Sequence, residues 1–349
     1  MAKHLVIMAG GVGSRFWPMS TSEQPKQFID ITGCGRTMIQ QTFDRFQGII
    51  DIDHVWVVTN KNYKKYIIKQ LTGINQQHIL LEPCMRNTAP CIAYVSWKIQ
   101  KEDPAALIVV APSDHLVLQV EKFQDTIRKG FEFIVQGERI LTLGMQPTHP
   151  ETGYGYIEQG MPAGTGSDGI YQLTAFHEKP DLKTAIAYLQ AGGYSWNSGM
   201  FMWKVGTIIK ELRQYASQIA LVMDKILPAM FHSEEQDTVN EFFPTCEKIS
   251  IDYAVMEKTQ IAYVLPANFG WSDLGTWSSL HALTPHDEYD NAIIGKHVKL
   301  IESQGNIISV PSNKQVVIQG LKHCIVSEYD NALLICQLSE EQKIKEWHH

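Results

Sequence analysis

Short apolar segments recur through the first third of the chain. The first, His4–Ala9, ends at Gly10, which indicates a buried strand that feeds a loop. The further runs of this kind are Val55–Thr59, His78–Leu81 and Leu107–Ala111. Segments long enough for a crossover helix separate them. This alternation predicts an α/β fold, with a mostly parallel sheet flanked by helices on both faces.

The chain's length and its change of character near Pro285 predict two domains. A chain of 349 residues exceeds the usual size of one hydrophobic core. After Pro285 the sequence turns to short β-rich runs separated by turn residues, and Leu338–Trp347 is typical of a short terminal helix. We therefore expect a large domain over residues 1–285 and a small β domain over 286–349.

Composition excludes several classes of partner. The net charge of −7 argues against broad nucleic-acid binding, which demands a basic surface. No apolar run approaches the length of a membrane span, so we expect a soluble protein with no membrane partner. The six cysteines form no CxxC pair and no zinc-type spacing. Reduced thiols and a cytoplasmic location are the expectation.

A glycine-rich loop follows the first predicted strand. Gly10, Gly11, Gly13 and Ser14 lie where small residues let backbone N–H groups approach phosphate oxygens. The loop lacks the Gly-Lys-Ser/Thr ending of a Walker motif, and Phe16 stands where a dinucleotide fingerprint needs its third glycine. On these residues alone, a ligand-free turn stays open.

Two cations follow the loop closely. Arg15 belongs to Arg-Phe-Trp-Pro-Met-Ser, and Lys26 to Gln-Pro-Lys-Gln-Phe. Both would lie near a loop already suited to phosphate. A polyphosphate leaving group needs such charge, so we expect Arg15 and Lys26 to meet it.

Seven collinear blocks give the chain a specific resemblance. They are Gly10-Gly-Val-Gly-Ser-Arg-Phe-Trp-Pro-Met-Ser with Pro25-Lys-Gln-Phe, Glu82-Pro-x-x-Arg-Asn-Thr-Ala-Pro, Pro112-Ser-Asp-His, Gly153-Tyr-Gly-Tyr-Ile, Phe176-His-Glu-Lys-Pro, Trp196-Asn-Ser-Gly-Met-Phe and Trp271-Ser-Asp-Leu-Gly-Thr-Trp. In this order they resemble the mannose-1-phosphate guanylyltransferases, within the sugar nucleotidyltransferases.

The resemblance implies a fold, a reaction and partners. The fold would be the Rossmann-like nucleotide-diphospho-sugar transferase type, with a tail resembling a partial left-handed β-helix. The reaction would transfer GMP from GTP to α-D-mannose 1-phosphate, with Mg²⁺ as cofactor and release of pyrophosphate. A homodimer is expected. We expect no isomerase domain of the kind that longer family members carry.

The resemblance also assigns site residues. Asp114, which follows the fourth apolar run, and Asp273 would hold Mg²⁺ and act with Arg15 and Lys26. A hydrogen-bonding set would bind the nucleotide together with the glycine loop: Glu82, Arg86, Asn87 and Thr88. The set for the sugar phosphate is Gly155, Tyr156, Glu178, Lys179, Asn197 and Gly199.

Several alternatives stay open. Relatives acting on manno-heptose or fucose 1-phosphate would need only small pocket changes. A catalytically silent nucleotide-binding regulator would be expected to have lost Lys26, Asp114 or Asp273, and this chain keeps all three. An oxidoreductase is disfavoured by Phe16. His115 is not assigned as a base, because an anionic phosphate nucleophile needs none.

Overall fold

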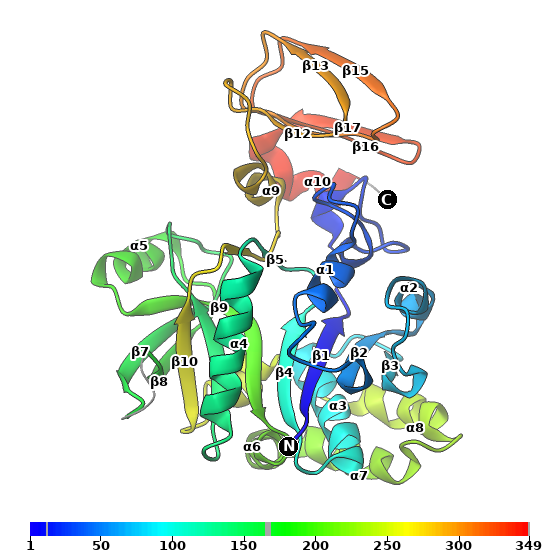
Figure 1. Cartoon of the computed structure of the whole chain (residues 1–349), viewed down its shortest axis with the longest axis vertical. Helices are drawn as coiled ribbons and strands as arrows, with labels where there is room; N and C mark the ends of the chain where they lie inside the picture. The colour runs from blue at the N-terminus through cyan, green and yellow to red at the C-terminus, as the bar shows by residue number, and fades with distance from the viewer. Residues whose placement is uncertain (12, 165–168, 348–349) are drawn as a thin grey trace. The chain divides into compact units, whose positions relative to one another are not determined.

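The computed structural model describes residues 1–11, 13–164 and 169–347 (Figure 1). Val12 of the glycine loop, His348 and His349 lie outside them. The chain divides into two compact units. The first consists of Met1–Gly10, Phe43–Pro112 and Val117–Trp271, and the second of Gly11–Thr42, Ser113–Leu116 and Ser272–His349. The second unit thus combines early segments with the C-terminal one, and the functional boundary at 285/286 stays a prediction.

A nine-stranded sheet forms the centre of the first unit, in the order β3-β2-β1-β4-β9-β6-β10-β8-β7. Strands β3, β2, β1 and β4 pair in parallel, as do β6 and β10, whereas β8 and β9 run against their neighbours. The sheet is therefore mixed: seven of its nine strands run in one direction, as expected for a mostly parallel sheet, and β8 and β9 run in the other. The strands are β1 (Lys3–Ala9), β2 (Val55–Asn60), β3 (Ile79–Glu82), β4 (Leu107–Pro112), β6 (Ile140–Met145), β7 (Tyr156–Pro162), β8 (Tyr171–His177), β9 (Tyr194–Lys204) and β10 (Ala262–Ala267).

One end of this sheet closes on itself. Strand β7 pairs with β8 and also with β9, so β9, β6, β10, β8 and β7 form a ring of five strands. Ile157, Phe176 and Val264 pack together on strands of the ring. No strand partners were predicted from the sequence for this end of the sheet.

Helices cover both faces of the sheet. The main core joins Val6, Trp56 and Trp203 of the strands to α3 (Thr88–Glu102), α6 (Val205–Tyr215), α7 (Ser217–Ile226) and α8 (Glu235–Phe242). Helix α4 (Val120–Ile134) packs Gly130 against Met202, which points away from Trp203 because side chains alternate along a strand. The remaining elements of this unit include α2 (Lys64–Gln70), α5 (Leu182–Ala191) and the one-turn helix η8 (Asp252–Met256).

The second unit has a sheet of its own. Strands β12 (Ala292–Ile294), β14 (Ile307–Ser309) and β16 (Cys324–Tyr329) pair in parallel, and β17 (Ala332–Gln337) adds antiparallel. Strands β13 (His297–Ile301) and β15 (Gln315–Gln319) form a second parallel pair. The core of this unit unites Phe16, Met38 and Trp277 with Ile307 and Ile325, so early and late segments fold together.

Short elements complete the chain. Helix α1 (Met38–Asp44) ends in the first unit, and β5 (Leu116–Val117) and β11 (Trp271–Ser272) lie where the chain passes between units. The second unit also holds η1 (Ser14–Phe16), η2 (Lys26–Phe28), α9 (Trp277–Leu283), η9 (Leu338–Lys343) and α10 (Ile344–Trp347). The terminal segment is therefore largely 3₁₀ rather than α-helical.

Asn87 caps helix α3, because its side chain accepts the Thr88 N–H and Thr88 is already helical. Two further expectations can be compared with the structure. All six cysteines are free thiols. Among the residues described, no helix has the length and apolar character needed to cross a bilayer.

Candidate functional site

Lys26 lies at the centre of a group of oxygen atoms in the second unit. Its side chain is buried at the start of η2, 4% exposed. The ammonium Nζ lies 2.9 Å from Asp114 Oδ2 and donates to the carbonyl oxygens of Asp273 at 2.8 Å and Leu274 at 3.0 Å. These three acceptors match the three N–H groups of a lysine. One ammonium group thereby connects three distant chain segments, two of which carry the aspartates predicted to bind a metal.

The charge of Lys26 controls the ionisation of Asp114. Burial alone would raise the pKa of this carboxyl, but the Lys26 ammonium, the neighbouring His115 and hydrogen bonds together hold the pKa below its ordinary value. Asp114 is therefore ionised at neutral pH. An ionised carboxylate in this group of oxygens suits a hard cation.

A tight turn presents the carbonyl oxygens to Lys26. Leu274 is fully buried with a φ of 46°, which is unusual for a residue with a branched side chain. The turn is closed by the Gly275 N–H, which donates to Asp273 Oδ1 at 2.8 Å, and by the Leu274 N–H, which donates to Ser272 Oγ at 3.0 Å. Such strain is typical of functional segments.

The described part of the glycine loop packs against the Lys26 segment. Gly13 has a φ of 66°, and a Cβ added there would lie 2.6 Å from Lys26 Cβ. The Gly11 carbonyl accepts a hydrogen bond from Gln27 Nε2 at 2.8 Å. Ser14 opens η1 directly after Gly13. Glycine at position 13 is thus required both by the backbone angle and by the close approach of Lys26.

Arg15 is exposed and is held by the C-terminal part of the second unit. Its Nε donates to Gln342 Oε1 at 3.0 Å, and its carbonyl accepts the Trp277 indole N–H at 3.0 Å. Trp277 is fully buried against Phe16, so it packs rather than lining a ligand site. The predicted contact of Arg15 with a leaving pyrophosphate stays a prediction.

In the first unit, the loop after β1 lies close to the end of β3. A Cβ added at Gly10 would lie 3.8 Å from Glu82 Oε2. Glu82 is buried, and its Oε1 has no hydrogen-bond partner among the residues described. Burial raises the pKa of Glu82 to about 8, against a smaller opposing effect of a hydrogen bond with Cys91. Glu82 is therefore mostly protonated at neutral pH, so it can donate as well as accept.

The segment after Glu82 is anchored to a distant stretch of the same unit. Arg86 donates from its Nη2 to the Pro244 carbonyl, and Thr88 Oγ1 accepts the Ile251 N–H at 2.9 Å. Asn87 has a φ of 69°, a strained value for a residue with a side chain. Hydrogen bonds thus connect this segment to residues 244 and 251 of the same unit.

Four of the predicted sugar-phosphate residues lie together. Asn197 N donates to the Gly155 carbonyl at 2.8 Å, and Asn197 Oδ1 accepts the Gly199 N–H at 3.1 Å. A Cβ added at Gly155 would lie 2.8 Å from Glu178 Oε2, so Glu178 also borders this group. Lys179 forms an ion pair with Glu178. Gly155, Glu178, Asn197 and Gly199 thus form one cluster.

Asp252 belongs to this cluster and was missed by the sequence reasoning. Its Oδ1 accepts a hydrogen bond from Asn197 Nδ2 at 3.0 Å. Burial, and then the nearby Glu178 carboxylate, raise the pKa of Asp252 to about 6. An aspartate at the start of a helical turn is ordinarily interpreted as a cap. Only the long-range contact with Asn197 distinguishes Asp252.

The aromatic residues near the cluster divide into two groups. Tyr156 is fully buried against Tyr188, so its ring supports the fold. Tyr154 packs edge-on against both Trp196 and Trp271. The predicted direct contact of Tyr156 with the sugar phosphate stays a prediction.

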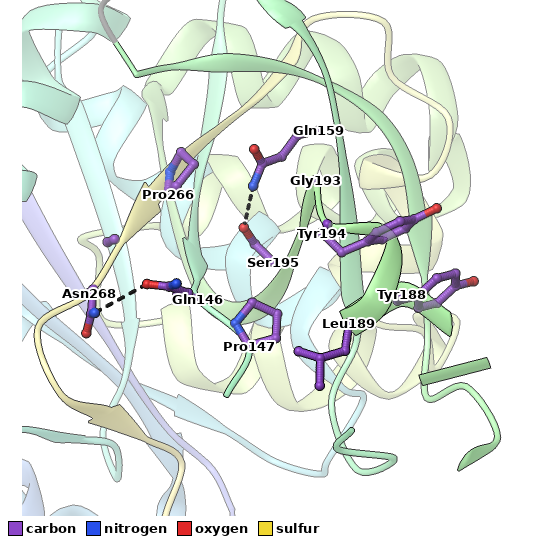
Figure 2. A pocket seen from close by; sticks show the side chains of 12 residues that line it. Gln146, Pro147, Gln159, Tyr188, Leu189, Gly193, Tyr194, Ser195, Pro266 and Asn268 are labelled. Carbon is purple, nitrogen blue, oxygen red and sulfur yellow. Dashed lines mark hydrogen bonds between the residues drawn. The ribbon is translucent and has the colours of Figure 1, made fainter. Parts of the chain in front are cut away.

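A pocket of about 420 Å³ opens at the end of the five-stranded ring (Figure 2). Gln159 donates to Ser195 Oγ at 2.8 Å, and Asn268 donates to Gln146 Oε1 at 3.3 Å. None of the residues that line the pocket is charged, and none belongs to the predicted sugar-phosphate set. This pocket suits neutral groups and is not the site predicted for a phosphate.

The chain matches known proteins along almost its full length. A family model described as nucleotidyl transferase matches residues 4–289. The alginate biosynthesis protein AlgA of Pseudomonas putida is 38% identical over 98% of this chain and 70% of its own length. The mannose-1-phosphate guanylyltransferase of Escherichia coli K12 is 35% identical over 97% of this chain and 71% of its own length.

A solved structure extends the match to the fold. The crystal structure described as mannose-1-phosphate geranyltransferase from Thermus thermophilus superposes with a TM-score of 0.88 at 26% sequence identity. The match covers 99% of this chain and 98% of that one. The α/β architecture of sugar nucleotidyltransferases is thereby shown for this chain.

Proposed function

Because this chain belongs to the nucleotidyl transferase family, among the mannose-1-phosphate guanylyltransferases, we propose that it makes GDP-mannose from GTP and α-D-mannose 1-phosphate. A phosphate oxygen of the sugar phosphate forms a bond to the α-phosphorus of GTP. The bond from that phosphorus to the bridging oxygen breaks, and pyrophosphate leaves with the electron pair. The observation that carries the proposal is the set of contacts made by the Lys26 ammonium, here called the Lys26 group. It joins the Asp114 carboxylate to the 272–275 turn.

The chemistry calls for positioning and charge neutralisation rather than a base. The attacking phosphate is already an anion, so proton removal contributes little. Anionic reactants repel each other, and fixed cations and dipoles lower that cost. We assign this role to Lys26, Arg15 and the glycine loop, in which Gly10, Gly11, Gly13 and Ser14 offer backbone N–H groups.

The carboxylates of Asp114 and Asp273 fit a magnesium ion. Both are hard oxygen donors, and the low pKa of Asp114 keeps it ionised without a metal. When bound, Mg²⁺ would supply charge neutralisation to phosphate oxygens. The protein's own contribution is to hold the two aspartates in place through Lys26 and the 272–275 turn.

Substrate recognition is assigned to residues of the first unit. We propose that Glu82, Arg86, Asn87 and Thr88 read guanine, with protonated Glu82 as a neutral donor and acceptor. The cluster of Gly155, Glu178, Asn197 and Gly199, together with Lys179 and Tyr156, would bind the sugar phosphate. Asp252 would act through Asn197, whose side-chain amide it orients.

Three finer features are also proposals. The parallel pairings β12–β14–β16 and β13–β15 support a tail of the partial left-handed β-helix type. Exposed Leu333 and Ile335 on β17 support a homodimer through this tail, which sizing chromatography would test. Six free thiols support a cytoplasmic location.

Pyrophosphate release tests the proposed reaction. The protein is incubated with GTP, Mg²⁺ and a panel of sugar 1-phosphates that includes those of mannose, fucose and manno-heptose. We expect the highest kcat/KM with mannose 1-phosphate and GTP, and a much lower value with ATP. Preference for another sugar 1-phosphate would reassign the acceptor, and no release with any sugar would indicate a silent regulator on the same fold.

A further inference from the structure

Three potential metal ligands gather at the C-terminal end of α9, within the second unit. His281, His286 and Asp290 each offer one ligand atom, and these atoms all lie within 4.8 Å of one another. No other group of three or more such side chains meets this criterion in the described part of the chain. The proposed reaction uses none of the three.

Both histidine rings are anchored by backbone carbonyl groups. His281 Nε2 lies 2.9 Å from the Asp290 carbonyl oxygen, and His286 Nε2 lies 2.8 Å from the His281 carbonyl oxygen. A carbonyl oxygen only accepts, so each Nε2 carries the proton, and a neutral ring keeps its lone pair on Nδ1. Metal-bound histidines almost always donate from their second nitrogen in this way.

The gap between His286 and Asp290 has the width of a metal site. His286 Nδ1 lies 3.5 Å from Asp290 Oδ1. When the His286 ring is neutral, its Nδ1 and Asp290 Oδ1 are both hydrogen-bond acceptors, and no hydrogen atom lies between them. Zinc bonds of ~2.0–2.2 Å in a tetrahedral arrangement separate two ligand atoms by about 3.4 Å. A cation between these atoms would therefore need little movement of either side chain.

The loop that carries His286 and Asp290 is held in place independently of any metal. Asp287 Oδ1 accepts the N–H groups of Tyr289 and Asn291, both at 2.9 Å. His286 forms an antiparallel bridge with Ala292 at the start of β12. Metal sites bind tightly when their ligands are already positioned by such contacts.

We propose that His281, His286 and Asp290 bind a divalent transition metal of the zinc type, with water as the fourth ligand. Two imidazole nitrogens and one carboxylate suit Zn²⁺, whereas Mg²⁺ prefers oxygen ligands only. The site is thus chemically distinct from the Asp114 and Asp273 pair. Its metal fastens α9 to the loop that leads into β12.

Zinc titration by calorimetry, in excess Mg²⁺, tests the site. His348 and His349 are first replaced by alanine, because a terminal histidine pair can itself bind zinc. We expect one Zn²⁺ per chain, with Kd raised at least ~10-fold in His286→Ala and in Asp290→Asn. His297→Ala, at an exposed histidine on β13, is the matched control and should bind zinc as the parent does.

Two further readouts keep the test decisive. Tetrahedral Co²⁺ absorbs strongly in the visible, so the parent should give this signal and His286→Ala should lose it. Melting temperatures without metal should agree between the parent and the variants, since His286 and Asp290 are exposed. The site is refuted if the parent binds no zinc at ~100 µM, or if both variants bind it as tightly as the parent.

Discussion

Replacing Gly13 with alanine perturbs the Lys26 group through a single added methyl group. The new Cβ would lie 2.6 Å from Lys26 Cβ, and Gly13 has a φ of 66°. Ordinary carbon contacts lie at about 3.5–4.0 Å. Lys26 must therefore move by about 1 Å, or the loop must take another conformation.

The two costs have separate physical origins. A side chain at positive φ costs about 1–2 kcal/mol. Forcing a methyl group into a packed site costs about 1–3 kcal/mol more. We expect Gly13→Ala to lower the free energy of unfolding by about 2–5 kcal/mol. Turnover should fall as well, because moving Lys26 disturbs its contacts with Asp114 and with the 272–275 turn.

Urea unfolding followed by circular dichroism measures the stability change. Gly11→Ala is the matched control for stability, because a Cβ there meets no atom within 4 Å. Its free energy of unfolding should stay within about 0.5 kcal/mol of the parent's. If Gly13→Ala proves as stable as Gly11→Ala, the close approach of the loop to Lys26 does not constrain the residue at position 13.

Three further predictions concern charge and positioning. Lys26→Ala and Asp273→Ala should each lower kcat at least ~100-fold in the pyrophosphate assay, and near-parent turnover would refute the assigned role. Glu82 has a pKa of about 8 in the folded protein and an ordinary pKa in the unfolded chain. Between these two pKa values, unfolding releases a proton, so the free energy of unfolding falls as the pH rises, by up to about 1.4 kcal/mol per pH unit. Glu82→Gln should remove that slope in urea titrations between about pH 5 and about pH 8, and an unchanged slope would contradict the raised pKa. Asp252→Ala should raise the KM for mannose 1-phosphate about 5- to 10-fold by releasing Asn197, with the KM for GTP unchanged; an equal rise in both would indicate general damage.

Local patterns in the sequence predicted the first four strands of the central sheet. The runs at 4–9, 55–59, 78–81 and 107–111 correspond to β1, β2, β3 and β4 with ends shifted by one residue. Buried parallel strands are continuous apolar runs, so their signal is contained in a few residues. Gly10 and Glu82 lie close together because the carboxyl ends of parallel strands meet at one edge of a sheet.

Long-range contacts could not be predicted in this way. Asn197 and Asp252 lie 55 residues apart, and Arg15 and Gln342 lie 327 apart. No periodicity or spacing carries such pairings, which arise only when the elements pack. The same limit applies to the second unit, whose core joins Phe16 to Ile325 through tertiary packing alone.

The contacts of Lys26 distinguish two ways in which this residue could raise the reaction rate. Its three N–H groups already have three acceptors, on Asp114, Asp273 and Leu274, so a phosphate oxygen could gain Lys26 only by displacing one of them. If Lys26 exchanges partners during the reaction, Lys26→Ala should raise the KM for pyrophosphate in the reverse direction. If Lys26 instead positions Asp114 and the turn, the variant should need more Mg²⁺ for half-maximal rate, with the KM for pyrophosphate little changed at saturating metal. The buried ion pair favours the second outcome, because removing Lys26 leaves Asp114 without its main compensating charge.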